Sequence, residues 1–258
     1  MDKLLRFPFS CFVLISGVFL TSCTDRYLFD MPDTIETRLY EQDAEILSRF
    51  VDIDMENGWY YLNTQRGSFF DLLPQSYRNE LNLVAEENRQ IFLREMEILN
   101  RNLASVIDNG SSDFVVFSTP RKYVTKKINP NSTIEFFSKS PGTSTRLANQ
   151  SHSLSLTGFD DAQNQLNFNS GKYVDCLVDM TASGGSNFLI TISESKSNAT
   201  PNGSDPTNPY SITYSGYGSY SGITRWTHSN WGNNLQWNME SYIAIAPTTG
   251  NAVFSSVQ

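Results

Sequence analysis

The strongest constraint on the fold of this chain is the regular spacing of turn-forming residues in its second half. After Gly110, short runs of β-branched and aromatic residues alternate with stretches of Gly, Pro, Asn and Ser. Short strands at this spacing are typical of antiparallel β-sandwiches and jelly rolls. The sequence predicts eleven such strands, at residues 114–118, 123–128, 133–137, 153–157, 165–168, 173–180, 188–193, 210–214, 223–228, 235–246 and 252–257.

The first half of the chain differs from the second in charge. Residues 24–108 carry 17 acidic and 8 basic side chains, whereas residues 109–258 carry 9 of each. A shift this sharp favours two differently built regions that meet near Gly110. The whole chain has a net charge of −8. Because a nucleic-acid-binding surface needs clustered Lys and Arg, we expect no nucleic acid as a partner.

Two helices are predicted in the acidic region. Asp33 and Glu36 have the spacing of a capping box, and apolar residues then recur at helical intervals to about Arg49. A second apolar stripe covers residues 76–108, with charged residues on the other faces and an Asn-Gly stop after it. One helix of about 30 residues would extend about 45 Å.

Residues 51–62 are predicted to form a β-hairpin. Two β-rich runs flank Asn57-Gly58, and both residues tolerate the positive φ that a tight turn requires. Asp52 and Asp54 alternate as at the start of an EF-hand calcium loop. Such a loop needs Gly at its sixth position, where this chain has Asn57, so we expect no calcium site here.

The amino terminus has the features of a bacterial export signal. Basic residues precede a mostly apolar run, Phe7 to Leu20, which is too short to span a bilayer comfortably. The run ends in Leu20-Thr21-Ser22-Cys23, which resembles the lipobox of bacterial lipoproteins. This resemblance implies cleavage before Cys23, acylation of that residue with lipid such as palmitate, and anchoring in a bilayer. Thr24 follows the cysteine in place of Asp, which by analogy favours the outer membrane.

We therefore expect an α+β protein in four parts. Residues 1–22 would form the leader, 23–32 a tether, 33–110 a helical region with a small β-hairpin, and 111–258 an antiparallel β-sandwich or jelly-roll-like domain. The order of helix, hairpin and long Glu/Arg-rich helix over residues 33–108 resembles that of uncharacterised secreted lipoproteins of gut anaerobes. That resemblance implies no known activity.

The sequence contains no catalytic or metal-binding motif that we identify. Once Cys23 is lipidated, Cys176 has no cysteine partner, and its strand-like surroundings predict that it is buried. His152 and His228 have no second His or Cys at zinc-ligand spacing. We therefore expect no cofactor, no metal and no enzymatic activity.

A hydrolase with a pair of carboxylates is the enzymatic alternative. Glycosidases use two carboxyl groups about 5 to 9.5 Å apart. Most acids of the second half are expected to be solvated surface or turn residues. The candidates are Asp160-Asp161 in a predicted turn, Asp175 with Asp179 on one face of a strand, Glu194 and Glu240.

The candidate ligand site is a cluster of aromatic residues within the segment 210–237. Flat rings stack on the apolar faces of sugars or peptides, and nearby hydroxyl and amide groups bond the edges of the ligand. Tyr217, Tyr220 and Trp231 stand in turn-like surroundings and are expected to be exposed, whereas Trp237 is expected in the core. Alternatively, the rings pack sheet edges and loop bases. The candidate site comprises Tyr214, Tyr217, Tyr220, Trp226 and Trp231.

Together these observations predict a membrane-anchored, secreted lipoprotein of the outer membrane that faces the periplasm or the cell surface. Its expected role is that of a non-catalytic module that binds a glycan or another ligand. The first alternative is a structural or assembly component that docks a protein partner through the long helix or a sheet edge. The second is a glycoside hydrolase. The sequence indicates no oligomeric state.

Overall fold

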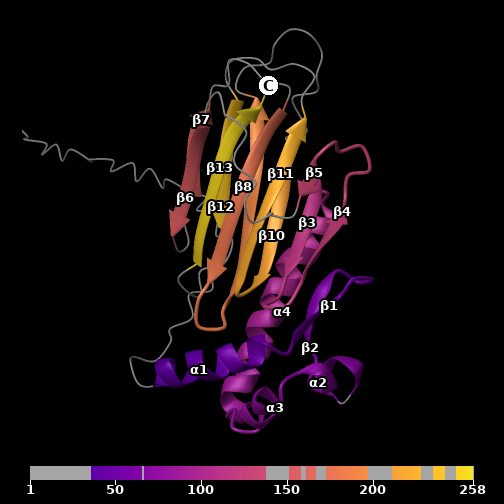
Figure 1. Cartoon of the computed structure of the whole chain (residues 1–258), viewed down its shortest axis with the longest axis vertical. Helices are drawn as coiled ribbons and strands as arrows, with labels where there is room; N and C mark the ends of the chain where they lie inside the picture. The colour runs from indigo at the N-terminus through magenta and orange to yellow at the C-terminus, as the bar shows by residue number, and fades with distance from the viewer. Residues whose placement is uncertain are drawn as a thin grey trace, which may run out of the picture. The chain divides into compact units, whose positions relative to one another are not determined.

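The computed structural model describes residues 36–65, 67–137, 151–157, 161–166, 173–196, 211–227, 235–241 and 248–257. Within them the chain is a mixed α+β protein in which strands predominate (Figure 1). The lipobox with Cys23, the predicted tether and Trp231 lie outside the described residues. None of the described helices is long and apolar enough to cross a membrane.

The eleven predicted strands of the second half are all present and form two sheets. Described neighbours pair antiparallel, with the exception of β3 and β10, which run parallel. The six-stranded sheet has the order β4 (Tyr123–Lys127), β3 (Phe114–Ser118), β10 (Ser211–Tyr217), β9 (Asn187–Lys196), β12 (Leu235–Ser241) and β7 (Asp161–Leu166). The five-stranded sheet has the order β5 (Glu135–Phe137), β11 (Ser219–Thr227), β8 (Tyr173–Ala182), β13 (Thr248–Val257) and β6 (Ser151–Thr157).

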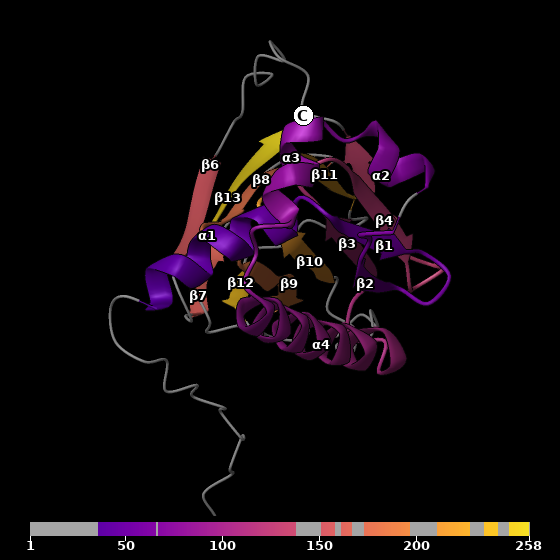
Figure 2. The same cartoon turned by 90° about the horizontal axis from the view of Figure 1, so that it is seen from below.

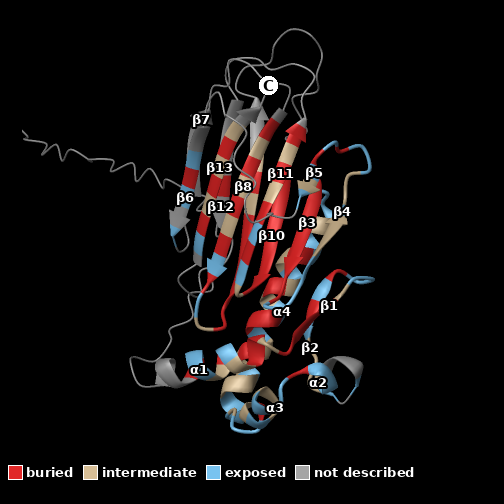
Figure 3. Cartoon of the chain, in the orientation of Figure 1, coloured by how far each residue is buried: buried red, intermediate tan, exposed pale blue. Residues whose placement is uncertain are grey.

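One hydrophobic core lies between the two sheets. Alternate residues of the five-stranded sheet, such as Val178 and Phe254, share a buried cluster with Ile190 and Tyr214 of the six-stranded sheet. Figure 3 shows the buried positions as a red band along the central strands. Cys176 belongs to this core as a free, buried thiol, which confirms the prediction for it. Burial raises the pKa of that thiol, so it acts as a small apolar residue.

Helices and a hairpin cover the other face of the six-stranded sheet. Leu47, Phe92 and Leu99 form a second buried cluster with Phe117 of β3 and Tyr217 of β10. In Figure 2 these helices lie in front of the sheets. The elements of this layer are α1 (Glu36–Ser48), β1 (Val51–Asp54), β2 (Trp59–Leu62), α2 (Ser68–Leu72), α3 (Gln75–Leu81) and α4 (Glu86–Asp108). Of these, α4 and the hairpin contact the strands, whereas α1, α2 and α3 lie below the sheets in Figure 1.

The second core continues across the boundary predicted near residue 110. All described residues belong to one compact unit. β3 and β10 are buried at every position, because one face meets the other sheet and the opposite face meets the helices. The two regions therefore differ in secondary structure and composition, but they share a core.

The single helix predicted over residues 76–108 is wrong, because the chain breaks into α3 and α4. The break has a physical cause outside the helix itself. Ala85, at the start of α4, has no side chain that can cap the helix. Asp43 of α1 supplies the acceptor, and its Oδ2 accepts hydrogen bonds from the Ala85 N–H at 3.0 Å and the Asn88 side-chain amide at 2.8 Å. A carboxylate is favourable at a helix N-terminus.

The first helix and the hairpin confirm their predictions within the described residues. β1 and β2 pair antiparallel, with Asp54 opposite Trp59 across the turn. Gly58 has a φ of 74°, a left-handed conformation that favours glycine. A Cβ at Gly58 would also lie 3.1 Å from a methyl carbon of Ile107 and 3.2 Å from the amine of Lys126.

Candidate functional site

The structure contradicts the exposure expected of the C-terminal aromatic cluster. Tyr217 and Tyr220, which were predicted to be exposed, are buried. Tyr214 and Trp226 are buried as well. These four rings present no face on which a ligand could stack, whereas Trp231 lies outside the described residues.

The burial of these rings follows from how tightly β10 and β11 are joined. β10 runs to Tyr217 and β11 starts at Ser219, so Gly218, with a φ of 78°, makes the turn between them. Tyr214 and Tyr220 then lie in the inter-sheet core, with ring centroids 5.2 Å apart. Tyr217 points to the helices, and its ring centroid lies 5.3 Å from that of Phe92.

The predicted carboxylates do not form a pair on the outer face of β8. Asp175 receives two hydrogen bonds from the guanidinium of Arg225, at 2.7 and 2.9 Å, and Asp179 accepts one from Ser221. Asp175 and Asp179 are four residues apart on one strand, so their Cα atoms lie about 13 Å apart. Glu194 and Glu240 lie in β9 and β12, strands of the other sheet.

A different pair of aromatic residues is exposed, on β2. Trp59 is 47% exposed and Tyr61 is 40% exposed, whereas Tyr60 between them is buried. The register places Asp54 opposite Trp59 and Asp52 opposite Tyr61. We call these four residues the hairpin face. Each ring on this face lies beside a carboxylate from the neighbouring strand.

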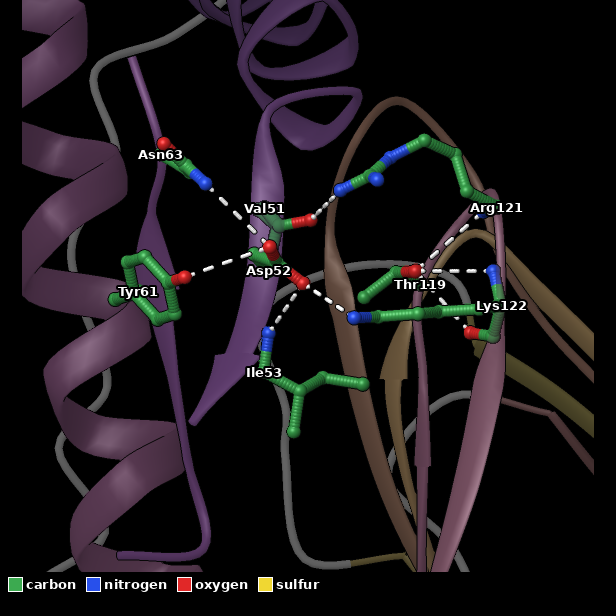
Figure 4. Close-up of polar contacts among 8 residues, drawn as sticks. All are labelled: Val51, Asp52, Ile53, Tyr61, Asn63, Thr119, Arg121 and Lys122. Atoms are coloured by element: carbon green, nitrogen blue, oxygen red, sulfur yellow. Dashed lines mark hydrogen bonds and ion pairs between the residues drawn. The ribbon is translucent and has the colours of Figure 1, made fainter. Parts of the chain in front are cut away.

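Asp52 is the centre of the polar contacts at the hairpin face (Figure 4). Its Oδ1 accepts a hydrogen bond from the Ile53 N–H at 2.9 Å and pairs with the Lys122 amine at 2.7 Å. Its Oδ2 lies 3.4 Å from both the Tyr61 hydroxyl and the Asn63 amide, which donate to it. Burial alone would raise the pKa of Asp52, but Lys122 and the Ile53 N–H outweigh burial and lower it. Asp52 is therefore ionised at neutral pH.

The turn between β3 and β4 directs two cations at β1. Thr119 Oγ1 accepts hydrogen bonds from the N–H groups of Arg121 and Lys122, at 3.4 and 3.2 Å. Arg121 donates to the Val51 carbonyl at 2.7 Å, while Lys122 reaches Asp52. Figure 4 shows both side chains extending from the turn towards β1. These contacts fix the outer edge of the hairpin.

Tyr60 and Asn100 fix the hairpin from behind. The Tyr60 hydroxyl donates to the Ser215 carbonyl at 2.9 Å and accepts from the Ser118 N–H at 3.0 Å. The Asn100 side chain of α4 bonds to both the N–H and the carbonyl of Tyr60, each at 2.8 Å, as a neighbouring strand would. The hairpin face is therefore a supported platform, unlike a free loop.

Asp54 organises the other end of the hairpin face. Its Oδ1 accepts hydrogen bonds from the N–H groups of Glu56 and Asn57, at 3.0 and 3.1 Å. Its Oδ2 accepts one from the Asn57 amide at 2.7 Å. The Asn57 side chain is the main reason that the pKa of Asp54 is lowered. Both carboxylates of the hairpin face are thus negative beside its two rings.

The chemistry of the hairpin face suits a ligand with an apolar face and many hydroxyl groups. Indole and phenol rings stack on the C–H faces of sugars, and the half-buried carboxylate of Asp54 can accept hydrogen bonds from sugar hydroxyls. The Asp52 carboxylate is buried and contributes its charge beside Tyr61. The side chain of Lys122 is 45% exposed and can donate at the rim. Among the described residues, no group of three or more His, Cys, Asp and Glu is arranged to hold a metal ion.

Sequence reasoning found the hairpin but missed its face. Part of the signal was available, because residues two apart on a strand share a face, so Trp59 and Tyr61 had to lie together. The Asn-Gly pair does not give the register, since the turn spans residues 55–58 and pairs Asp54 with Trp59. The alternation Trp-Tyr-Tyr-Leu does not by itself show which two side chains point outward. Compared with known protein families and with curated proteins, the chain matches none.

Proposed function

We propose that this chain is a lipid-anchored, secreted protein that binds a glycan through the hairpin face. The Leu20-Thr21-Ser22-Cys23 sequence supports the anchor, with acylated Cys23 in the outer membrane and the folded body facing the periplasm or the cell surface. The facing sheets support the finer assignment of the fold as a jelly-roll-like β-sandwich, to which the helices and hairpin add a third layer.

One observation carries the binding role. Trp59 and Tyr61 are exposed on a hairpin that is otherwise fixed by hydrogen bonds. Leaving two large rings in water forgoes the free energy of burying them, and a rigid platform loses little entropy when a ligand binds. The rings and flanking carboxylates together favour a glycan over a purely apolar ligand.

A glycan array probed with the full chain tests this proposal. Trp59→Ala combined with Tyr61→Ala should abolish binding, because it removes both stacking surfaces. Tyr123→Ala is the matched control, since Tyr123 is equally exposed at 47% but packs against Tyr220 on the other face of its strand. Binding that survives the double substitution, or that Tyr123→Ala removes equally, would refute the assignment.

A structural or assembly component remains the second candidate, and one observation favours it. Leu72, at the end of α2, and Leu83, after α3, are 84% and 78% exposed. Exposed leucines near one another in the chain suit contact with a protein. Cross-linking in intact cells should then recover a stoichiometric partner, and Leu72→Ser with Leu83→Ser should abolish its recovery. A glycoside hydrolase has less support, because Asp175 and Asp179 are engaged by Arg225 and Ser221.

A further inference from the structure

The six-stranded sheet ends in an open edge at β4. β4 bonds to β3 on one side, and no described strand pairs with its other side. In Figure 1 it lies at the right-hand border of the sheet. The opposite border differs, because β6 and β7 from the two sheets lie against each other there. An open edge strand is a template for an added strand.

The hydrogen bonds at both ends of β4 determine which of its backbone groups are free. Lys122 and Ile128, which flank the strand, bond through their backbones to the segment that carries β3. Hydrogen-bonded positions alternate along an antiparallel pair, so every second residue between them also faces β3. The intervening residues Tyr123, Thr125 and Lys127 therefore direct their N–H and carbonyl groups outward.

The same strand carries a concentration of positive charge in an acidic protein. The chain has a net charge of −8. Lys122 already holds a carboxylate, that of Asp52, beside this strand. Lysines on an edge oppose unspecific pairing, but they attract an acidic segment. Residues 114–134 contain no acidic residue and four basic ones, Arg121, Lys122, Lys126 and Lys127.

We propose that β4 is the docking edge for an extended acidic peptide of a partner protein, which joins the sheet as an additional strand. The peptide backbone bonds to Tyr123, Thr125 and Lys127. Its carboxylates lie opposite Lys126 and Lys127, on the two faces of the added strand. The Lys127 amine donates one hydrogen bond to the Ser132 carbonyl at 3.0 Å, and an ammonium group has two further N–H donors for the peptide. The edge borders the hairpin face at Lys122, which pairs with Asp52, but the peptide contacts lie along Tyr123–Lys127, so the proposal does not depend on glycan binding.

A synthetic heptapeptide of Glu and Val with Glu at neighbouring positions, so that an extended strand carries carboxylates on both faces, is the probe. A Lys-Val peptide of the same pattern is its control. The Glu-Val peptide should bind the full chain and slow amide hydrogen exchange at Tyr123, Thr125 and Lys127. Its affinity should fall on the order of tenfold between about 0.05 and 0.5 M salt. The Lys-Val peptide should not bind. Absence of binding, or protection confined to other strands, would overturn the proposal.

Substitutions in β4 separate backbone pairing from charge. Thr125→Pro removes one outward N–H at an edge position that tolerates proline, and should weaken the peptide about fivefold. Thr125→Val keeps the N–H and should leave affinity unchanged. Lys126→Glu with Lys127→Glu keeps the backbone and should abolish binding, which tests the proposal even if the proline variant does not fold. Equal peptide binding by the charge-reversed and original chains would contradict the proposal. Trp59→Ala, a change in the hairpin face, should leave the affinity for the peptide unchanged.

Discussion

The six-stranded sheet is buried on its two faces in different ways. Towards the five-stranded sheet, the core consists mainly of apolar side chains such as Ile190 and Phe254. Towards the helices, buried hydrogen bonds join the layers, as between the Tyr60 hydroxyl and Ser215. Apolar burial is non-directional, whereas a buried polar group is costly unless its partner is in place. The comparison indicates that apolar burial stabilises both faces and that buried polar contacts additionally hold the helical layer in one position.

Glu95 should make the stability of the helical layer depend on pH. This residue of α4 is buried, and its carboxyl group accepts a hydrogen bond from the Tyr40 hydroxyl of α1. Burial raises the pKa of Glu95 to about 7, although the Tyr40 hydrogen bond and the charge of Arg94 oppose that rise. No such carboxyl lies among the described residues of the inter-sheet core. The helical layer should therefore respond to titration near neutral pH.

Phe254→Ala should have the largest effect. Phe254 is fully buried between the sheets, and its loss should lower the free energy of unfolding by about 4 kcal/mol. Because the side chain of Phe254 does not titrate, this loss should not follow the titration of Glu95. Phe254→Leu should cost about 1 kcal/mol. Urea denaturation measures both, and a strong pH dependence of the loss would break the proposed contrast between the faces.

Glu95→Gln tests the titration of the helical layer. The ordinary pKa of 4.5 applies to the unfolded chain, whereas the folded carboxyl holds its proton to about pH 7. Between these values the unfolded state releases its proton first, so the free energy of unfolding falls as the pH rises, on the order of 3 kcal/mol in total. Glu95→Gln should remove this fall and be more stable than the original chain at about pH 8. Parallel pH profiles for the two proteins would show that Glu95 does not titrate in this way.

Tyr60→Phe should have a smaller effect, about 2 kcal/mol, since it leaves buried backbone groups without a partner. The affected groups are the Ser118 N–H and the Ser215 carbonyl. Tyr61→Phe is the matched control, because the Tyr61 hydroxyl is at the surface and makes a long hydrogen bond, 3.4 Å, to Asp52. Its loss should cost less than about 0.5 kcal/mol. Thermal unfolding of both variants provides the measurement. Equal losses would mean that the hydroxyl buried under the helices has no special role.

Local sequence patterns predicted the elements well where one rule decides the outcome. Short β-rich runs between turn residues located all eleven strands, although β7 begins at Asp161, which was expected in a turn. Asn57-Gly58 identified the hairpin because positive φ restricts the residues a tight turn accepts. The break between α3 and α4 could not be predicted in the same way. The residue that caps α4 is Asp43, which is distant in sequence and lies on another helix.

The exposure of Tyr217 and Tyr220 was mispredicted because exposure depends on what covers a strand. Tyr214 and Tyr217 stand among Ser, Thr and Gly, a composition also common in binding loops. β10 nevertheless lies between a sheet and a helical layer, so both of its faces are buried. Trp59 and Tyr61 have equally ordinary surroundings but lie on a two-stranded sheet with one open face.

The parallel pairing of β3 with β10 has a consequence for how the chain acquires its structure. Phe114 pairs with Ile212, so β3, which is synthesised early, cannot pair with β10 until that later strand has been synthesised. Tyr217, at the end of β10, also completes the cluster beneath α4. Non-local contacts of this kind slow folding and leave apolar surface exposed during synthesis. A chain truncated before Ser211 would thus be unable to close either core, and nascent chains of that length should depend on chaperones until β10 emerges.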